Sequence, residues 1–274
     1  PICLEHLSLG NGSDELIRSL IIATCLPCNG SVLVAEPTFS MYGILAESLG
    51  VPVVRVGRDA QFGVDCAAAQ REIDRREGDR PPVRVVFMVH PNSPTGNGVT
   101  SAELQWLLSL PPDILVVMDE AYFEFSRHTF IDLVLQRSNW VITRTFSKAF
   151  RLAAHRLGYA VGHPDFIAAL EKLRLPYNLP TFTQAAALAA LEHRSAILEG
   201  VTELMAERQR LAQALKGFPG ARCYPSVGNF LFLQLQAEYY PSMLTNPTQL
   251  YPTVLARMQR LGTLIRYKIG RAHV

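Results

Sequence analysis

Short apolar runs alternate with segments of helical periodicity, and this alternation constrains the fold of the chain more than any other feature. The runs lie at 31–35, 51–56, 83–89, 114–118, 140–144 and 157–161. The helical segments lie at 13–25, 41–50, 66–77 and 101–110. Because the runs are apolar at successive positions, they are typical of strands covered by helices on both faces. The alternation predicts an α/β fold with a mostly parallel sheet.

Two of the helical segments begin with residues that favour N-caps. Ser13 and Ser101 precede the first apolar positions of their segments, and a serine hydroxyl at such a position accepts a hydrogen bond from the first helical turn. We therefore expect these two serines to cap their helices.

The pattern changes near residue 194. A long amphipathic segment at 196–217 precedes a strand expected at 229–235, so we predict a large domain over 1–193 and a partial small domain over 194–267. The final heptapeptide "KIGRAHV", residues 268–274, continues no earlier pattern. We interpret it as a sequencing-adapter artefact, and the whole as a fragment lacking both termini.

Composition excludes several classes of protein. Of the 274 residues, 49% are apolar and 18% are charged, which suits a packed core rather than a disordered chain. A net charge of +2 with no long basic run argues against a nucleic-acid or anionic-membrane partner. No apolar run reaches the roughly 18 residues of a membrane span. We therefore expect a protein that binds neither nucleic acid nor a membrane.

The cysteine pattern indicates a reducing compartment. Five cysteines at irregular spacing suit the cytoplasm better than a disulfide framework. Cys25 and Cys28 form a C-x-x-C that could be a redox or metal motif. No second pair accompanies it, so we interpret it as two small residues at a turn between a helix and a strand. The histidines are scattered and match no metal motif, and we expect no metal.

Polar residues follow three of the expected strands. The turns read "HPNSPTGN" from 90, "DEAY" from 119 and "TFSK" from 145. Ligands of open α/β sheets bind beyond the carboxyl ends of the strands, at one edge of the sheet. The three turns are therefore expected to converge on one site.

The residues of these turns suit an aldehyde cofactor that carries a pyridine ring and a phosphate. Lys148 has apolar neighbours, and an amine in a partly apolar pocket more readily takes its neutral, nucleophilic form. Asp119 follows an apolar strand, and a protonated ring nitrogen would supply its cationic partner. An anion site could form from Thr145, Ser147 and Arg156 with the helix start at 12–14.

Two aromatic side chains complete the set. Tyr122 could donate a hydrogen bond to a phenolic oxygen, and Phe39 could stack on a ring. Taken singly, each candidate has an ordinary structural explanation: a surface lysine, a helix cap, a core phenylalanine or a turn. Their order, with each group after a separate strand, favours the site.

Five segments carry a resemblance to a known family. They are "GNGSDELI", "EPTFSMY", "HPNSPTGN", "DEAYFEF" and "RTFSKAFRLAAHRLGYAVG". They resemble the signatures of the pyridoxal-phosphate-dependent aminotransferases of fold type I, from about Leu7 to Tyr267. In this order they most closely resemble the histidinol-phosphate branch, although aromatic aminotransferases and threonine-phosphate decarboxylases share these turns.

The resemblance implies a role for each candidate residue. Lys148 would hold pyridoxal phosphate covalently and move the proton, Asp119 would pair with the ring nitrogen, and Tyr122 would lie near its phenolic oxygen; these three are the catalytic candidates. The other candidates implied are the phosphate ligands Ser13, Asp14, Thr145, Ser147 and Arg156, the stacking ring of Phe39, the cofactor-binding pair Asn92 and Ser93, and the substrate-binding Arg266.

The chain departs from the family pattern in three places. Ser93 stands where the family usually has the asparagine that contacts the cofactor, with Asn92 just before it. An arginine of the small domain and the N-terminal arm, which the family uses for substrate and dimer contacts, lie outside the sequence. The fragment is therefore expected to bind its cofactor poorly and to turn over little.

The resemblance implies an amino transfer from L-histidinol phosphate to 2-oxoglutarate in histidine biosynthesis. The expected partners are a small amino donor and a 2-oxo acid, in a cytoplasmic enzyme that is a homodimer when complete. One alternative is a related aromatic aminotransferase or threonine-phosphate decarboxylase. Another is a non-catalytic, aminotransferase-like effector domain of a transcription regulator, which would need a DNA-binding motif upstream.

Overall fold

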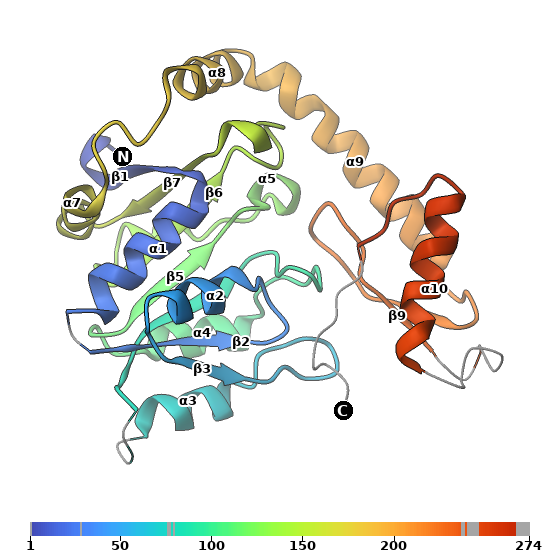
Figure 1. Cartoon of the computed structure of the whole chain (residues 1–274), viewed down its shortest axis with the longest axis horizontal. Coiled ribbons are helices and arrows are strands. Elements are labelled where there is room, and N and C mark those ends of the chain that lie inside the picture. The colour runs from blue at the N-terminus through green and yellow to red at the C-terminus, as the bar shows by residue number, and fades with distance from the viewer. Residues whose placement is uncertain are drawn as a thin grey trace.

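The computed structural model describes residues 2–27, 29–75, 78, 80–236, 239 and 247–266, with the backbone alone at 247–251 (Figure 1). The strands are β1 Leu7–Asn11, β2 Ser31–Ala35, β3 Val53–Val56, β4 Val83–Val89, β5 Leu115–Asp119, β6 Trp140–Thr145, β7 Leu157–Gly162, β8 Ala221–Cys223 and β9 Leu233–Leu235. The helices are α1 Gly12–Cys25, α2 Met41–Ser48, α3 Cys66–Asp74, α4 Ser101–Ser109, α5 Phe123–Ser126, α6 Ile131–Val134, α7 Pro164–Leu173, α8 Thr181–Glu192, α9 Arg194–Leu215 and α10 Pro247–Arg260, with short 3-10 turns η1 Leu4–His6 and η2 Ala153–His155.

Within the described residues, β1 to β7 form one seven-stranded sheet in the order β1-β7-β6-β5-β4-β2-β3. The five strands from β6 to β3 run parallel, whereas β7 is antiparallel to β6 and β1 is antiparallel to β7. The expectation of an α/β fold with a mostly parallel sheet is confirmed. Parallel strands place their carboxyl ends, and the turns that follow them, along one edge.

Helices cover both faces of the sheet, which explains why the central strands contain runs of consecutive apolar residues. Along β5, Leu115 and Val117 pack in the layer with α1, α2 and α7. Val116 and Met118 pack in the opposite layer, which contains side chains of α3, α4 and α6. All five residues of β5 are buried, so consecutive apolar residues are needed to fill two cores at once.

Each of the six expected strands of the large sheet forms, with small shifts at its ends. The edge strand β1 was not expected, because its residues "LSLGN" alternate in burial and include two polar residues and a glycine. Antiparallel pairing with β7 stabilises this short edge strand. Helices α7 and α8 were also missed, and the strand expected at 229–235 is confined to Leu233–Leu235.

Both predicted N-caps are wrong. The N-cap of α1 is Asn11, and Ser13 lies inside the first turn. Helix α4 is capped one residue earlier than expected: the Thr100 hydroxyl accepts a hydrogen bond from Glu103 N at 3.2 Å, and the Glu103 carboxylate accepts one from Thr100 N at 2.6 Å. This reciprocal pair forms a capping box, so the threonine starts the helix and Ser101 is its first residue.

The chain beyond residue 193 forms the long helix α9, the two-stranded β8–β9 sheet and α10 (Figure 1). The division into domains at 193/194 stays a prediction. Cys28, the second cysteine of the C-x-x-C motif, lies outside the described residues. The segment 268–274, interpreted as an adapter artefact, also lies outside them. Among the described residues, every helix is too short or too polar to span a membrane.

Candidate active site

The three polar turns meet at the carboxyl ends of β4, β5 and β6. Backbone hydrogen bonds join them directly: His90 N donates to Asp119 O at 2.8 Å, and Glu120 N donates to Thr143 O at 2.8 Å. The register pairs Asp119 with Val89 of β4 and with Thr143 of β6. The predicted convergence on one edge therefore occurs, because neighbouring parallel strands end at the same level.

Arg156 is the centre of a cluster that joins the start of α1 to the turn after β6. Its guanidinium contacts Asp14 Oδ2 at 3.1 Å and Ser147 Oγ at 3.4 Å. The Thr145 hydroxyl lies 3.0 Å from Ser147 Oγ. Four of the five expected phosphate ligands thus lie in one cluster, Asp14, Thr145, Ser147 and Arg156, and Ser13 is next to Asp14 in the chain. Arg156 is about half exposed and available to a ligand.

Two glycines allow the start of α1 to approach this cluster closely. A Cβ at Gly158 of β7 would lie 2.5 Å from Ser13 N, and a Cβ at Gly12 would lie 2.5 Å from the Arg156 guanidinium. Gly12 also has a φ of +74°, which glycine adopts without strain. The first N–H groups of α1 have no helical partner and carry the positive end of the helix dipole. The cluster is therefore suited to a phosphate.

Asp119 is buried at the end of β5 and held by two donors. The Tyr42 hydroxyl donates to Oδ2 at 2.6 Å, and Ala121 N donates to Oδ1 at 3.0 Å. Burial raises the pKa of Asp119 to about 6, whereas the hydrogen bond from Tyr42 acts to lower it. The sequence prediction of a buried carboxylate is confirmed, but the tyrosine that holds it was missed.

Lys148 lies over the face of Tyr122, with Nζ 5.3 Å from the ring centroid. The lysine is exposed, so the expectation of an amine in a partly apolar pocket is wrong: its apolar neighbours Phe146 and Ala149 turn into the protein, and the lysine side chain faces out of the turn. On its other side, the Tyr122 ring makes an edge contact with Phe230 at 5.0 Å. Lysine and tyrosine are thus brought together, as the sequence predicts.

Asn92 cannot contribute as expected. Its amide oxygen accepts hydrogen bonds from Thr38 Oγ1 at 2.9 Å and from Arg58 at 3.2 Å. Its amide nitrogen donates to Pro37 O at 3.1 Å and to Thr95 Oγ1 at 2.6 Å. An asparagine amide offers two donors and accepts two bonds, so no capacity is left for a ligand. Asn92 is a structural residue that ties the turn after β4 to the turn after β2.

Ser93 and Phe39 remain accessible. Neither side chain is fully buried, and Ser93 forms no side-chain hydrogen bond with another described residue, so its hydroxyl is available. Phe39 packs its edge against Tyr42 at 5.5 Å. Arg266 is exposed and forms no hydrogen bond or ion pair within the described part of the chain. Arg266 is therefore not joined to the candidate site.

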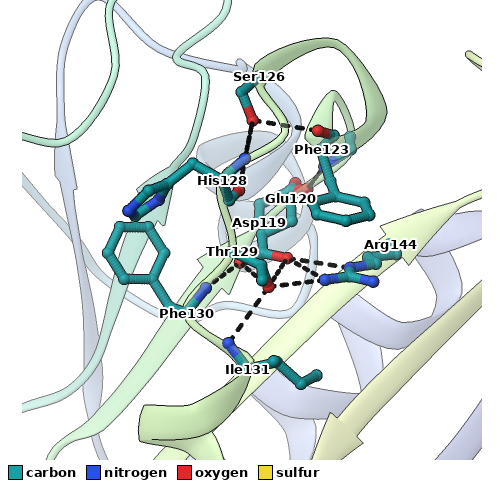
Figure 2. A network of polar contacts seen from close by, with 10 residues as sticks. Asp119, Glu120, Phe123, Ser126, His128, Thr129, Phe130, Ile131 and Arg144 are labelled. Carbon is teal, nitrogen blue, oxygen red and sulfur yellow. Dashed lines mark hydrogen bonds and ion pairs between the residues drawn. The ribbon is translucent and has the colours of Figure 1, made fainter.

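A second carboxylate in the same turn organises the loop behind the site (Figure 2). Glu120, buried next to Asp119, accepts hydrogen bonds from Arg144 Nε at 2.9 Å, Phe130 N at 2.7 Å and Thr129 Oγ1 at 2.9 Å. The Arg144 guanidinium also lies 3.8 Å from the centre of the Phe123 ring. The structure makes Glu120 the partner of an arginine on β6.

The residues present fit pyridoxal phosphate. The fit has three parts: an anion-binding cluster whose glycines let the start of α1 approach Arg156, a buried carboxylate for a ring nitrogen, and an exposed amine beside an aromatic ring. Elsewhere, Cys3, Glu5 and His6 at η1 lie close enough to share a metal ion, but they are largely exposed at the surface. The cofactor fit rests on the first set alone.

Comparison with known proteins gives the family. Residues 5–256 match the family model for aminotransferase class I and II. The histidinol-phosphate aminotransferase of Synechococcus elongatus is 55% identical over 264 residues, which cover 96% of this chain and 68% of that protein. Histidinol-phosphate aminotransferase 2 of a Nostoc species is 54% identical over 266 residues, covering 97% of this chain and 68% of that protein.

A solved structure shows the same fold. The histidinol-phosphate aminotransferase of Sinorhizobium meliloti, in complex with pyridoxal-5'-phosphate, matches with a TM-score of 0.79 and 24% identity over 98% of this chain and 70% of that chain. The family match covers the whole large sheet, the three turns and α9, so the resemblance seen in the sequence is confirmed. The chain belongs to the class I and II aminotransferase family.

Proposed function

We propose that the protein is a pyridoxal-phosphate-dependent aminotransferase that moves the amino group of L-histidinol phosphate to 2-oxoglutarate, forming imidazole-acetol phosphate and L-glutamate in histidine biosynthesis. Family membership and the names of relatives above 50% identity support the reaction. The single observation that carries the chemistry is the meeting of Asp119, Lys148 and the Arg156 cluster at one edge of the sheet. When bound, pyridoxal phosphate supplies an aldehyde that accepts the amino group and a ring that takes up the electron pair of the substrate carbon.

The residues of this chain would divide the remaining work. Lys148 Nζ provides the covalent anchor and carries the proton to and from the substrate carbon. Asp119, as a carboxylate, would accept a hydrogen bond from the protonated ring nitrogen and so would keep the ring cationic. The guanidinium of Arg156, with the Ser147 hydroxyl and the start of α1, binds the phosphate and fixes the orientation of the ring.

The ring of Tyr122 covers one side of the Lys148 amine. The Tyr122 hydroxyl is the candidate donor to the phenolic oxygen of the cofactor. Ser93 replaces Asn92 as the proposed contact from the turn after β4, because the amide of Asn92 is engaged. The Phe39 ring stays the proposed stacking partner. Arg266 stays a proposed substrate ligand that would have to move to the site.

Labelling with the cofactor tests the proposal directly. Purified protein mixed with pyridoxal phosphate and reduced with borohydride should carry the cofactor mass on the peptide that contains Lys148. Lys148→Ala should abolish this label, whereas Lys172→Ala on the exposed face of α7 should keep it. Label that persists after Lys148→Ala would refute the assignment.

Substrate assays separate the alternatives within the family. Histidinol phosphate, phenylalanine and threonine phosphate, each supplied with 2-oxoglutarate, should give glutamate fastest with histidinol phosphate. A preference for phenylalanine would indicate an aromatic aminotransferase. Loss of carbon dioxide from threonine phosphate would indicate a decarboxylase. A DNA-binding motif upstream of Pro1 in the full reading frame would favour the non-catalytic effector domain.

We also infer a homodimer in the cytoplasm. Large apolar side chains lie exposed between α7 and α8 and along α8, at Leu175 (70%), Tyr177 (96%), Phe182 (86%) and Leu188 (69%). An exposed apolar face of this kind marks an interaction surface, and a second copy of the chain is the proposed partner. Cys3, Cys66 and Cys223 are free thiols, which suits a reducing compartment.

A further inference from the structure

Tyr42 is an entirely buried tyrosine whose hydroxyl ends on the Asp119 carboxylate. It lies in the first turn of α2, 77 positions before the aspartate, and donates to Oδ2 at 2.6 Å. Its ring stacks on Phe87 of β4, with centroids 4.5 Å apart and planes 10° apart. The stacked ring fixes the place of the hydroxyl, so the phenol reaches the end of β5 in one orientation.

The surroundings leave the Asp119 carboxylate few other sources of support. Ala121 N binds Oδ1, and this backbone contact depends only on the turn. The Thr143 hydroxyl on the neighbouring strand is fully buried and has no hydrogen-bond partner of normal geometry within the described residues. The Thr143 hydroxyl also acts to lower the pKa of Asp119, but less than Tyr42 does. Tyr42 is thus the side chain that holds the carboxylate by a short, charge-assisted bond.

We propose that Tyr42 is the positioning residue of Asp119: its hydroxyl keeps the carboxylate ionised and turned so that it can pair with the cofactor's ring nitrogen. The inference rests on the proposed function for the identity of that partner. Tyr42 acts through Asp119, since it binds the carboxylate oxygen and no reacting atom. The sequence singled out the neighbouring Phe39 and did not consider Tyr42.

Electrostatics supports this division of labour. Burial raises the pKa of Asp119 to about 6, and the Tyr42 hydrogen bond opposes that effect. The other charged group that acts on Asp119 is Asp14 at the start of α1, which also raises the pKa. Burial, with the charge of Asp119, raises the pKa of Tyr42 well above its usual value, so the phenol stays protonated and remains a donor.

A titration of the cofactor-free protein isolates the contact. Carboxyl carbon NMR of the protein labelled at aspartate should show the pKa of Asp119 about one unit higher in Tyr42→Phe than in the wild type, because the ionised carboxylate loses the hydrogen bond that stabilises it. The phenylalanine keeps the stacking on Phe87, so the fold should persist. Tyr224→Phe, which removes a hydroxyl that donates to Gln234 at 2.7 Å, is the matched control and should leave Asp119 unchanged.

A hydroxyl-retaining variant protects the test against misfolding. Replacing Tyr42 with 3-fluorotyrosine makes the phenol a stronger donor, so the pKa of Asp119 should fall below its wild-type value. Opposite shifts in the two variants indicate the hydrogen bond itself, because a packing defect would not reverse its sign. An Asp119 pKa that stays the same in both variants would overturn the proposal.

Cofactor binding links the contact to the site. With a one-unit shift, the ionised fraction of Asp119 at pH 6 falls from about one half to about one tenth, so the Kd for pyridoxal phosphate should rise roughly five-fold in Tyr42→Phe. The difference should disappear at pH 9, where both carboxylates are ionised. Equal Kd values at pH 6 would overturn the proposed role while leaving the labelling of Lys148 intact. If the wild type binds no cofactor and the NMR shifts still occur, the proposed function fails and the role of Tyr42 in holding the carboxylate stands.

Discussion

Two buried side chains at the ends of adjacent strands have pKa values shifted in opposite directions for the same physical reason. Burial disfavours the charged form of both, which raises the pKa of Asp119 to about 6 and lowers that of His90, after β4, to about 4. His90 Nδ1 accepts a hydrogen bond from Val99 N at 3.0 Å, and its Nε2 has no partner within the described residues. Neighbouring His128 lowers the His90 pKa further. Burial thus favours the neutral form of both side chains, at a cost in stability wherever either one is charged.

His90 should make the protein sensitive to mild acid. Its folded pKa is depressed, so the stability it contributes is present above pH 6.5 and is lost as the pH falls towards 4. Between pH 7.5 and 4.5 the loss amounts to about 2.5 kcal/mol. In His90→Asn, whose side-chain oxygen can still accept from Val99 N, urea unfolding should show this pH dependence reduced by that amount.

The slope from Asp119, which has the opposite sign, is present in both proteins and cancels in the comparison. His193→Asn, at an exposed histidine between α8 and α9, should follow the wild-type curve. Parallel curves for wild type and His90→Asn would contradict the prediction.

At the scale of elements, the two turns that carry the catalytic candidates Asp119, Tyr122 and Lys148 are tied together by one buried ion pair. Glu120 follows Asp119 directly. Arg144 lies on β6, four residues before Lys148. Arg144 Nη2 lies 2.7 Å from Glu120 Oε2, with the glutamate side chain fully buried and the arginine side chain 13% exposed. Thr129 and Phe130 N complete the carboxylate's shell, so the loop from 120 to 131 is fixed against β6 (Figure 2).

Glu120→Gln should destabilise the fold by about 3 kcal/mol, because it leaves the Arg144 guanidinium buried without its counter-charge. Urea unfolding at pH 7 measures the change. Glu207→Gln removes the partner of Arg210 from an exposed pair on α9 and should give no measurable change. If the two variants lost equal stability, Arg144 would not depend on Glu120.

At the scale of the whole molecule, the chain after 193 folds back onto the site. Val227 N donates to Gly96 O at 2.8 Å, and Phe62 packs against Tyr224 with centroids 4.8 Å apart. A Cβ at Gly96 would lie 2.6 Å from Ser226 Oγ, so this close approach needs the glycine. The turn after β4 is therefore held between the large sheet and the segment before β9, while the apolar face near α8 stays open.

A polar substitution on that face should break the proposed dimer. Sedimentation of the wild type should give twice the 30.4 kDa mass of one chain, and Phe182→Asp should give the single-chain mass at the same concentration. The charge would have to be buried unpaired in the interface. Leu261→Asp, at a residue that is 73% exposed beyond α10, is the control and should remain dimeric. A monomeric wild type would refute the dimer.

The sequence alone determined six strands of the large sheet, most of the helices between them and the turns that carry the chemistry, although it gave no sign of β1, α7 or α8. Burial on both faces requires consecutive apolar residues, and that requirement is written locally in runs such as 83–89 and 114–118. The order of "HPNSPTGN", "DEAY" and "TFSK" after their strands placed the site, because parallel strands end at one edge. Lys148, Asp119 and Arg156 could be named for the same reason.

Tertiary structure alone decided which partner each polar group has. The contacts of Tyr42 with Asp119 and of Arg156 with Asp14 span 77 and 142 positions, so they depend on strand order and helix packing rather than on any local pattern. The same holds for Asn92, whose amide bonds to residues of two other turns and to Thr95 of its own turn. It holds too for Lys148, which is exposed although its neighbours in the sequence are apolar. A hydrogen bond requires two atoms within about 3 Å, and only the folded chain brings such distant residues that close.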